Sequence, residues 1–238
     1  MRSMSASGAA LSWLCWTLVV FVIASAVLAL GISQNILVKP PDVPSTTDLV
    51  ERIAQYRAFD QGANTMFLIS NLAGLGVFLL VPVIGVLLRP IAGTGPARDV
   101  MAVVLIVGGI VGIIAELTII AVNQAATFGY CDCGYRTEEL IAQSYALDIG
   151  FAIQSWLASG ALAIVGVGAA LAGRLVNLSA AWRWLSYAIA VGLILAVVLQ
   201  LAGYEDAATL VTAVASGIGV TIWAIILARR AGQMGTAS

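Results

Sequence analysis

The sequence predicts an all-α protein, a polytopic transmembrane helical bundle with six spans. Hydrophobic residues make up 61% of its 238 residues, only 10% are charged, and the mean hydropathy is +1.02. Soluble domains carry about 25% charged residues, so a surface this poor in charge has to be covered largely by lipid. The length suits one membrane domain over residues 1–238 and leaves no room for an additional soluble domain.

Six apolar runs are long enough to cross a bilayer, whose hydrocarbon core of about 30 Å requires about 20 residues of helix. We place the spans at residues 11–32, 63–88, 100–122, 149–172, 185–201 and 209–228. Two long segments, 33–62 and 123–148, join the first span to the second and the third to the fourth. The glycines that are frequent within the spans allow close approach between helices in lipid.

The distribution of charge predicts that both termini are cytoplasmic. In this orientation seven Lys and Arg residues lie inside, and the four outside are spread over much longer segments, as the positive-inside rule requires. Aromatic residues are expected to form two belts at headgroup level. The inner belt comprises Trp13, Trp16, Trp182, Trp184 and Trp223, and the outer belt Tyr56, Tyr130, Tyr135, Tyr145 and Tyr204.

The first span also has features of a cleavable signal peptide. Arg2 precedes the apolar run, and Ala24-Ser25-Ala26 resembles a cleavage site. Because the run continues through Leu30, beyond the usual length of a signal core, we favour an uncleaved anchor in the cell membrane.

Two of the outer segments resemble each other, which predicts a duplicated helical hairpin. Residues 53–62 (IAQYRAFDQG) and 141–150 (IAQSYALDIG) are identical at six of ten positions. The match aligns Asp60 with Asp148, and Asn71 and Ser159 each follow their aspartate by eleven residues. Chance similarity between apolar flanks is the alternative.

The chain before each match is amphipathic, which predicts short outer helices. They are expected to lie at the outer surface or to extend the following spans outward. Ser45 and Asp48 have the spacing of a capping box for the first helix, and Thr137 would cap the second.

Glu116 is the acidic residue that lies deepest within a predicted span. Inserting an ionisable group into hydrocarbon costs about 2.5–3.5 kcal/mol, so such a group should face the bundle interior. We expect Glu116 to be protonated at neutral pH unless an arginine reaches it. It would then serve either as a proton or cation site, or as a neutral acid hydrogen-bonded to polar neighbours such as Asn71.

A second polar cluster is predicted at the outer ends of the second and fourth spans. Asp60 and Asp148 occupy equivalent positions there, with Asn64 and Gln154 about a turn deeper. These residues could line one vestibule for a polar ligand. Alternatively, the aspartates cap or charge helix amino termini, and the amides hold neighbouring helices together.

Cys131 and Cys133 fall on the predicted outer side, where a disulfide could persist. Separated by one residue, they would close a small, strained ring, and strained disulfides are labile and oxidising. Free thiols or a bond to another chain are the alternatives, and Cys15 is interpreted as a small apolar residue. The sequence has no histidine, which removes the Ser-His-Asp triad and the commonest general base. We expect no metal site and no cofactor.

Three short motifs lie at span ends: Leu87-Leu88-Arg89-Pro90, Asp148-Ile149-Gly150 and Trp182-Arg183-Trp184-Leu185-Ser186. Together with the span pattern they resemble a bacterial family of six-span membrane proteins catalogued only as a domain of unknown function. The resemblance covers nearly the whole chain, but the Cys131 and Cys133 pair lies outside the family pattern. It implies the fold and no activity.

These observations favour a non-enzymatic membrane protein that binds a partner protein, a second copy of itself, a lipid or a small apolar ligand through its outer surface. One alternative is a proton-coupled small-molecule carrier that uses Glu116. Another is an extracytoplasmic thiol–disulfide protein that uses Cys131 and Cys133. The net charge of -1 gives no reason to expect nucleic acid as a partner.

The predicted orientation can be tested by labelling. Cysteines introduced at Ser45 and Thr137 should react with a membrane-impermeant reagent in intact cells, and a cysteine at Thr94 should not. The charge asymmetry places only the first two outside. Labelling at Thr94 alone would overturn the orientation.

Overall fold

Six helices in the computed structural model are long and apolar enough to cross a membrane, which confirms the predicted fold class. The structure describes residues 6–44, 47–128, 137–176 and 178–234, and these contain no strand. The first five spans are α1 (Ala6–Ser33), α2 (Leu49–Leu88), α3 (Pro96–Phe128), α4 (Thr137–Leu175) and α5 (Ala180–Leu201). The sixth consists of α6 (Glu205–Thr212), the π-helical segment η1 (Ala213–Val220) and α7 (Thr221–Met234). The chain is therefore a multi-pass integral membrane protein.

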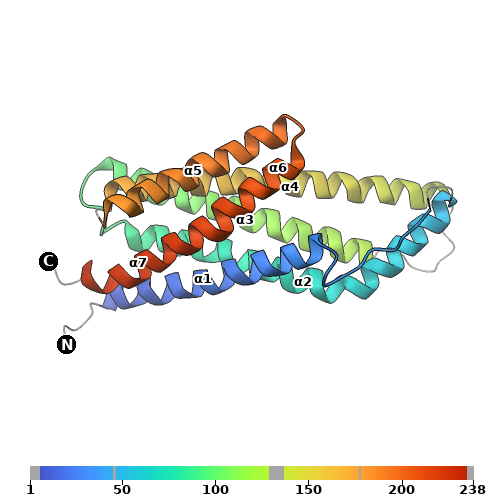
Figure 1. Cartoon of the computed structure of the whole chain (residues 1–238), viewed down its shortest axis with the longest axis horizontal. Coiled ribbons are helices and arrows are strands. Elements are labelled where there is room, and N and C mark those ends of the chain that lie inside the picture. The colour runs from blue at the N-terminus through green and yellow to red at the C-terminus, as the bar shows by residue number, and fades with distance from the viewer. Residues whose placement is uncertain (1–5, 45–46, 129–136, 177, 235–238) are drawn as a thin grey trace.

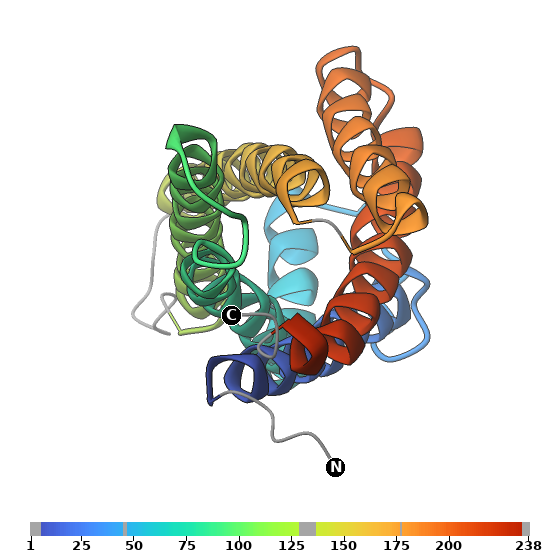
Figure 2. The same cartoon turned by 90° about the vertical axis from the view of Figure 1, so that its left-hand side faces the viewer.

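The helices are arranged as a ring in chain order. Each span packs against the next, and α1 closes the ring by packing against α7 as well as α2 (Figure 2). α1 begins and α7 ends at the same end of the bundle, which we call the proximal end (Figure 1). We call the opposite end, where α2 and α4 begin, the distal end.

The two longest helices reach well beyond the thickness of a bilayer. α2 has 40 residues and α4 has 39, so each is about 60 Å long at 1.5 Å per residue, about twice the hydrocarbon core. The predicted outer helices are thus continuous with the spans that follow them. The first helix is capped differently from the prediction. Asp48 itself is the cap, because its side chain accepts a hydrogen bond from the Val50 amide at 3.0 Å. Ser45, which the sequence predicted as part of the cap, lies outside the described residues.

The buried core lies in the proximal half, where all six spans contribute side chains. At its centre the Trp182 and Trp223 rings stack with 5.3 Å between centroids. Trp223 Nε1 donates to Ser186 Oγ at 2.9 Å, and Ser186 Oγ donates to the Trp182 carbonyl oxygen at 2.9 Å. Trp182 Nε1 in turn donates to the Trp223 carbonyl oxygen at 3.3 Å.

This core corrects part of the predicted aromatic belt. Trp182 and Trp223 are 0% and 5% exposed, whereas Trp13 and Trp184 are 68% and 70% exposed. Burial of an indole is favourable when its N–H finds an acceptor, and the neighbouring helix supplies one to each ring. Trp182 and Trp223 are therefore core residues and not headgroup anchors.

Small residues on α3 let it approach α2 closely. A Cβ on Gly112 would overlap the Phe78 ring, and a Cβ on Gly109 would overlap the Pro82 ring. Close packing of this kind holds membrane helices together, because lipid offers no hydrophobic driving force for their association. We call this contact the glycine seam.

The glycine seam should be sensitive to a single methyl group. We expect Gly112→Ala to lower the free energy of unfolding by about 1–3 kcal/mol, because the Phe78 ring must move. Gly160→Ala is the matched control on α4, since no atom lies within 4 Å of the added Cβ. Thermal unfolding in detergent would measure both variants, and equal melting temperatures would contradict the role of the seam.

Candidate functional site

Distal to the glycine seam, the α2–α3 contact becomes polar. Glu116 on α3 is partly buried and faces Gly74 on α2. Its Oε1 atom lies 2.5 Å from the point where a Cβ of Gly74 would stand. The absence of a side chain at Gly74 therefore makes the space for the carboxyl group, which faces a neighbouring helix as the sequence predicted.

Asn71 was predicted as a partner for Glu116, and the structure shows no hydrogen bond between them. The Asn71 Nδ2 atom is buried and has no acceptor within the described residues. Helical Cβ atoms tilt toward the amino terminus of their own helix. α2 and α3 run in opposite directions, so the Asn71 side chain is inclined distally and the Glu116 side chain proximally. Similar depth in the membrane was therefore not enough to pair them.

Farther toward the distal end, an amide pair joins α2 and α3. Gln124 Nε2 donates to Asn64 Oδ1 at 3.1 Å. This bond favours the interpretation of Asn64 as an interhelical contact. We refer to Asn64, Asn71, Glu116 and Gln124 together as the polar seam.

The aspartates that the sequence aligned differ in their surroundings. Asp60 is partly buried on α2, whereas Asp148 is exposed on α4. Each stands eleven residues after the first residue of its helix, so the interpretation of both as amino-terminal caps was wrong. The equal spacing is what a duplicated hairpin would produce, and duplication stays a prediction. Gln154 is partly buried on α4, and its side chain makes no hydrogen bond within the described part of the chain.

The cysteine candidates contribute nothing to the described structure. Cys131 and Cys133 lie outside the described residues, and Cys15 is buried in α1. Across the described ranges, no group of three or more His, Cys, Asp and Glu side chains could hold a metal ion.

One polar cluster between α4 and α5 was missed at the sequence level. Ser159 Oγ donates to Gln200 Oε1 at 2.6 Å, and Gln200 Nε2 donates to Ser155 Oγ at 2.9 Å. Ser155 and Ser159 are four residues apart, which places them on one helix face. That spacing, together with the position of Gln200 near the end of its span, was the available signal.

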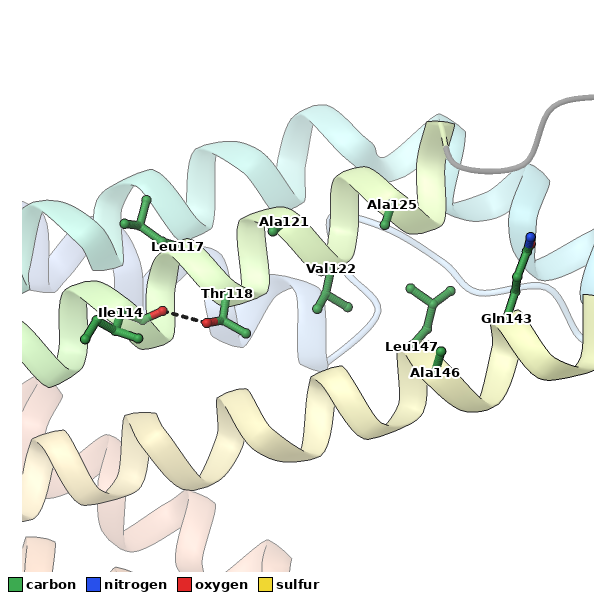
Figure 3. Close-up of a pocket in the computed structure, with 9 residues that line it drawn as sticks. All are labelled: Ile114, Leu117, Thr118, Ala121, Val122, Ala125, Gln143, Ala146 and Leu147. Carbon is green, nitrogen blue, oxygen red and sulfur yellow. Dashed lines mark hydrogen bonds between the residues drawn. The ribbon is translucent and has the colours of Figure 1, made fainter.

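A groove on the distal part of α3 was also missed. It has a volume of about 740 Å³ and lies between α3 and α4 (Figure 3). α3 contributes Ile114, Leu117, Thr118, Ala121, Val122 and Ala125, and α4 contributes Gln143, Ala146 and Leu147.

The wall of this groove is almost wholly apolar. The Thr118 hydroxyl donates to the Ile114 carbonyl oxygen at 2.8 Å and so presents little unsatisfied polarity. Gln143 stands at the distal end, and Ile114 lies at the other end (Figure 3). In sequence, the lining residues of α3 look like any lipid-facing helix surface, which is why the pattern did not reveal a hollow.

Comparison with protein families, with curated proteins and with solved structures finds no match.

The α4–α5 cluster yields a stability prediction. Gln200→Ala should lower the free energy of unfolding by about 1–2 kcal/mol, because two interhelical bonds of about 0.6 kcal/mol average strength are lost and two serines are left unpaired. Gln154→Ala, which removes an amide without such bonds, should have little effect. Unfolding in mixed micelles would measure the difference, and equal losses would refute the role of the cluster.

Proposed function

We propose that this protein is a non-enzymatic membrane protein that binds the acyl chain of a membrane lipid in the groove between α3 and α4. The observation that carries the proposal is the groove itself. Its volume of about 740 Å³ falls within the range of about 300–1,000 Å³ that is typical of small-molecule sites. Its lining matches a hydrocarbon ligand.

The position of the groove favours a lipid over a water-borne ligand. All of its lining residues belong to the candidate spans of α3 and α4, and those of α4 lie at the distal end of its span, near the expected membrane surface. The surrounding bilayer therefore supplies acyl chains directly at the groove. The α3 lining runs from Ile114 to Ala125, a length of about 16 Å at 1.5 Å per residue, which suits an extended chain.

The side chains along the groove also favour a thin occupant. The lining includes three small side chains, those of Ala121, Ala125 and Ala146, and two larger ones, those of Leu117 and Leu147. Gln143 adds an amide at the distal end, where a lipid ester or headgroup could accept or donate a hydrogen bond. A helix from a partner protein or a second copy of this chain is the competing occupant.

We further propose that the protein lies in the cell membrane with both termini in the cytoplasm. Arginines near the proximal helix ends support this orientation, and they are Arg89, Arg98, Arg174, Arg183, Arg229 and Arg230. The positive-inside rule places such a set on the cytoplasmic side. The groove would then open toward the outer leaflet.

Filling the groove tests the proposal. Ala121→Trp should place an indole in the hollow and abolish crosslinking to a phospholipid that carries a photoreactive group on its acyl chain. Ala188→Trp on α5 is the matched control, because Ala188 is also exposed and lies outside the groove. Mass spectrometry of crosslinked peptides from the protein in nanodiscs would locate the label.

Labelling of wild-type peptides 114–125 and 143–147 that disappears only in Ala121→Trp would support the proposal. Undiminished labelling in Ala121→Trp would overturn it. A dimer in native mass spectrometry that Ala121→Trp dissociates would instead assign the groove to a second copy of the chain.

A further inference from the structure

We infer that Glu116 is a proton-binding site that water reaches from the distal end of the bundle along the polar seam between α2 and α3. The inference does not rest on the proposed lipid binding, because Glu116 is not among the α3 residues that line the groove. Four observations carry it: the place of Glu116 against Gly74, the lack of charged neighbours, the unpaired Asn71 amide, and the close packing on the proximal side.

No charged side chain stands near Glu116 along the helices that pack against α3. These helices are α2 and α4. α2 has no charged residue between Asp60 and Arg89, and α4 has none between Asp148 and Arg174. On α3 itself, the nearest charged residue in the described part is Asp99. An ionised Glu116 would therefore be uncompensated in the membrane, which is costly, so the carboxyl group holds a proton.

The polar seam provides a route for that proton. Asn71 stands three residues distal to Gly74 and presents a buried N–H without an acceptor in the described structure. Asn64 follows about 10 Å farther along α2, at 1.5 Å per residue, and pairs there with Gln124 of α3. A gap of this length needs a chain of water molecules and not a single one, and each water in such a chain can satisfy buried polar groups with two to four hydrogen bonds. Asp60, partly buried, stands one further turn toward the distal end.

The route ends at Glu116. On its proximal side the Phe78 ring fills the space beside Gly112, and the Pro82 ring fills the space beside Gly109. A proton can therefore arrive and leave from the distal side only. The step is simple: hydronium at the distal end gives its proton to the Glu116 carboxylate, and water and the neutral carboxylic acid are the products.

Infrared spectroscopy of the full-length protein in nanodiscs tests whether the proton is there. At neutral pH the wild-type protein should show a carbonyl stretching band of a protonated carboxylic acid that Glu116→Gln removes. Asp148→Asn is the matched control, since Asp148 is exposed, and it should leave the band unchanged. Retention of the band in Glu116→Gln, or its absence from the wild-type protein, would overturn the inference.

Thiol accessibility tests the route. In a protein with Cys15 replaced by Ala, and Cys131 and Cys133 by Ser, the variants Asn64→Cys, Asn71→Cys and Glu116→Cys should react with a small, charged methanethiosulfonate reagent.

Two controls should fail to react. Val81→Cys is buried in the core one turn proximal to Phe78, beyond the closed end of the route, and Leu72→Cys is adjacent to Asn71 but 49% exposed on the outer surface, where lipid covers it. Reaction at Asn64→Cys alone would show that the polar seam is closed to water on the distal side of Glu116, which would refute the route. Equal reaction at Leu72→Cys would show general water access and would refute it as well.

Discussion

The close contact between α2 and α3 at the glycine seam fixes the register on which the remaining polar contacts depend. Gly109 and Gly112 are spaced so that the Pro82 and Phe78 rings fit against them in turn. Because both helices rise by 1.5 Å per residue and run in opposite directions, the same register sets Glu116 against Gly74 about one turn beyond the contact of Gly112 with Phe78. It then brings the Gln124 amide to Asn64. Two small residues therefore determine where the acid and the three amide side chains of the polar seam can lie.

The proximal and distal halves of the bundle differ in how closely their helices pack and in how their buried polar groups are satisfied. In the proximal half all six spans contribute to one core, and a satisfied network of two indoles and one hydroxyl joins α5 to α7. Each buried polar atom of that network has a partner, as a low-dielectric interior requires. In the distal half the chain continues mainly as α2, α3 and α4 (Figure 1). With fewer helices to cover them, the α3–α4 contact leaves a groove, and the α2–α3 contact retains an amide that has no acceptor among the described residues.

The sequence predicted the fold because hydropathy and length decide whether a helix spans a membrane. It also predicted that Glu116 faces a neighbouring helix, because the cost of exposing an acid to lipid is large. It did not predict Trp182 in the core, since an indole at a span end fits a headgroup belt and a buried stack equally well until its hydrogen-bond acceptor is known. The π-helical turns of η1 were also missed. Backbone hydrogen bonds span five residues in a π-helix and four in an α-helix, and an apolar sequence does not reveal this difference. The sequence could not predict the groove, because the groove forms between α3 and α4 and its depth depends on how the two helices pack.

The two proposed sites lie on opposite flanks of the same helix, and this has a thermodynamic consequence. Glu116 and Leu117 are neighbours in sequence, yet one faces α2 and the other lines the groove toward α4. A displacement of the distal part of α3 toward α2 would therefore affect both sites. A shift that opens the groove would press the Glu116 carboxyl group against Gly74, where an added Cβ already has no room. If an acyl chain favours one position of α3, the affinity of Glu116 for its proton changes with it. Linkage then requires the reverse effect, by the same factor, of the proton on the lipid.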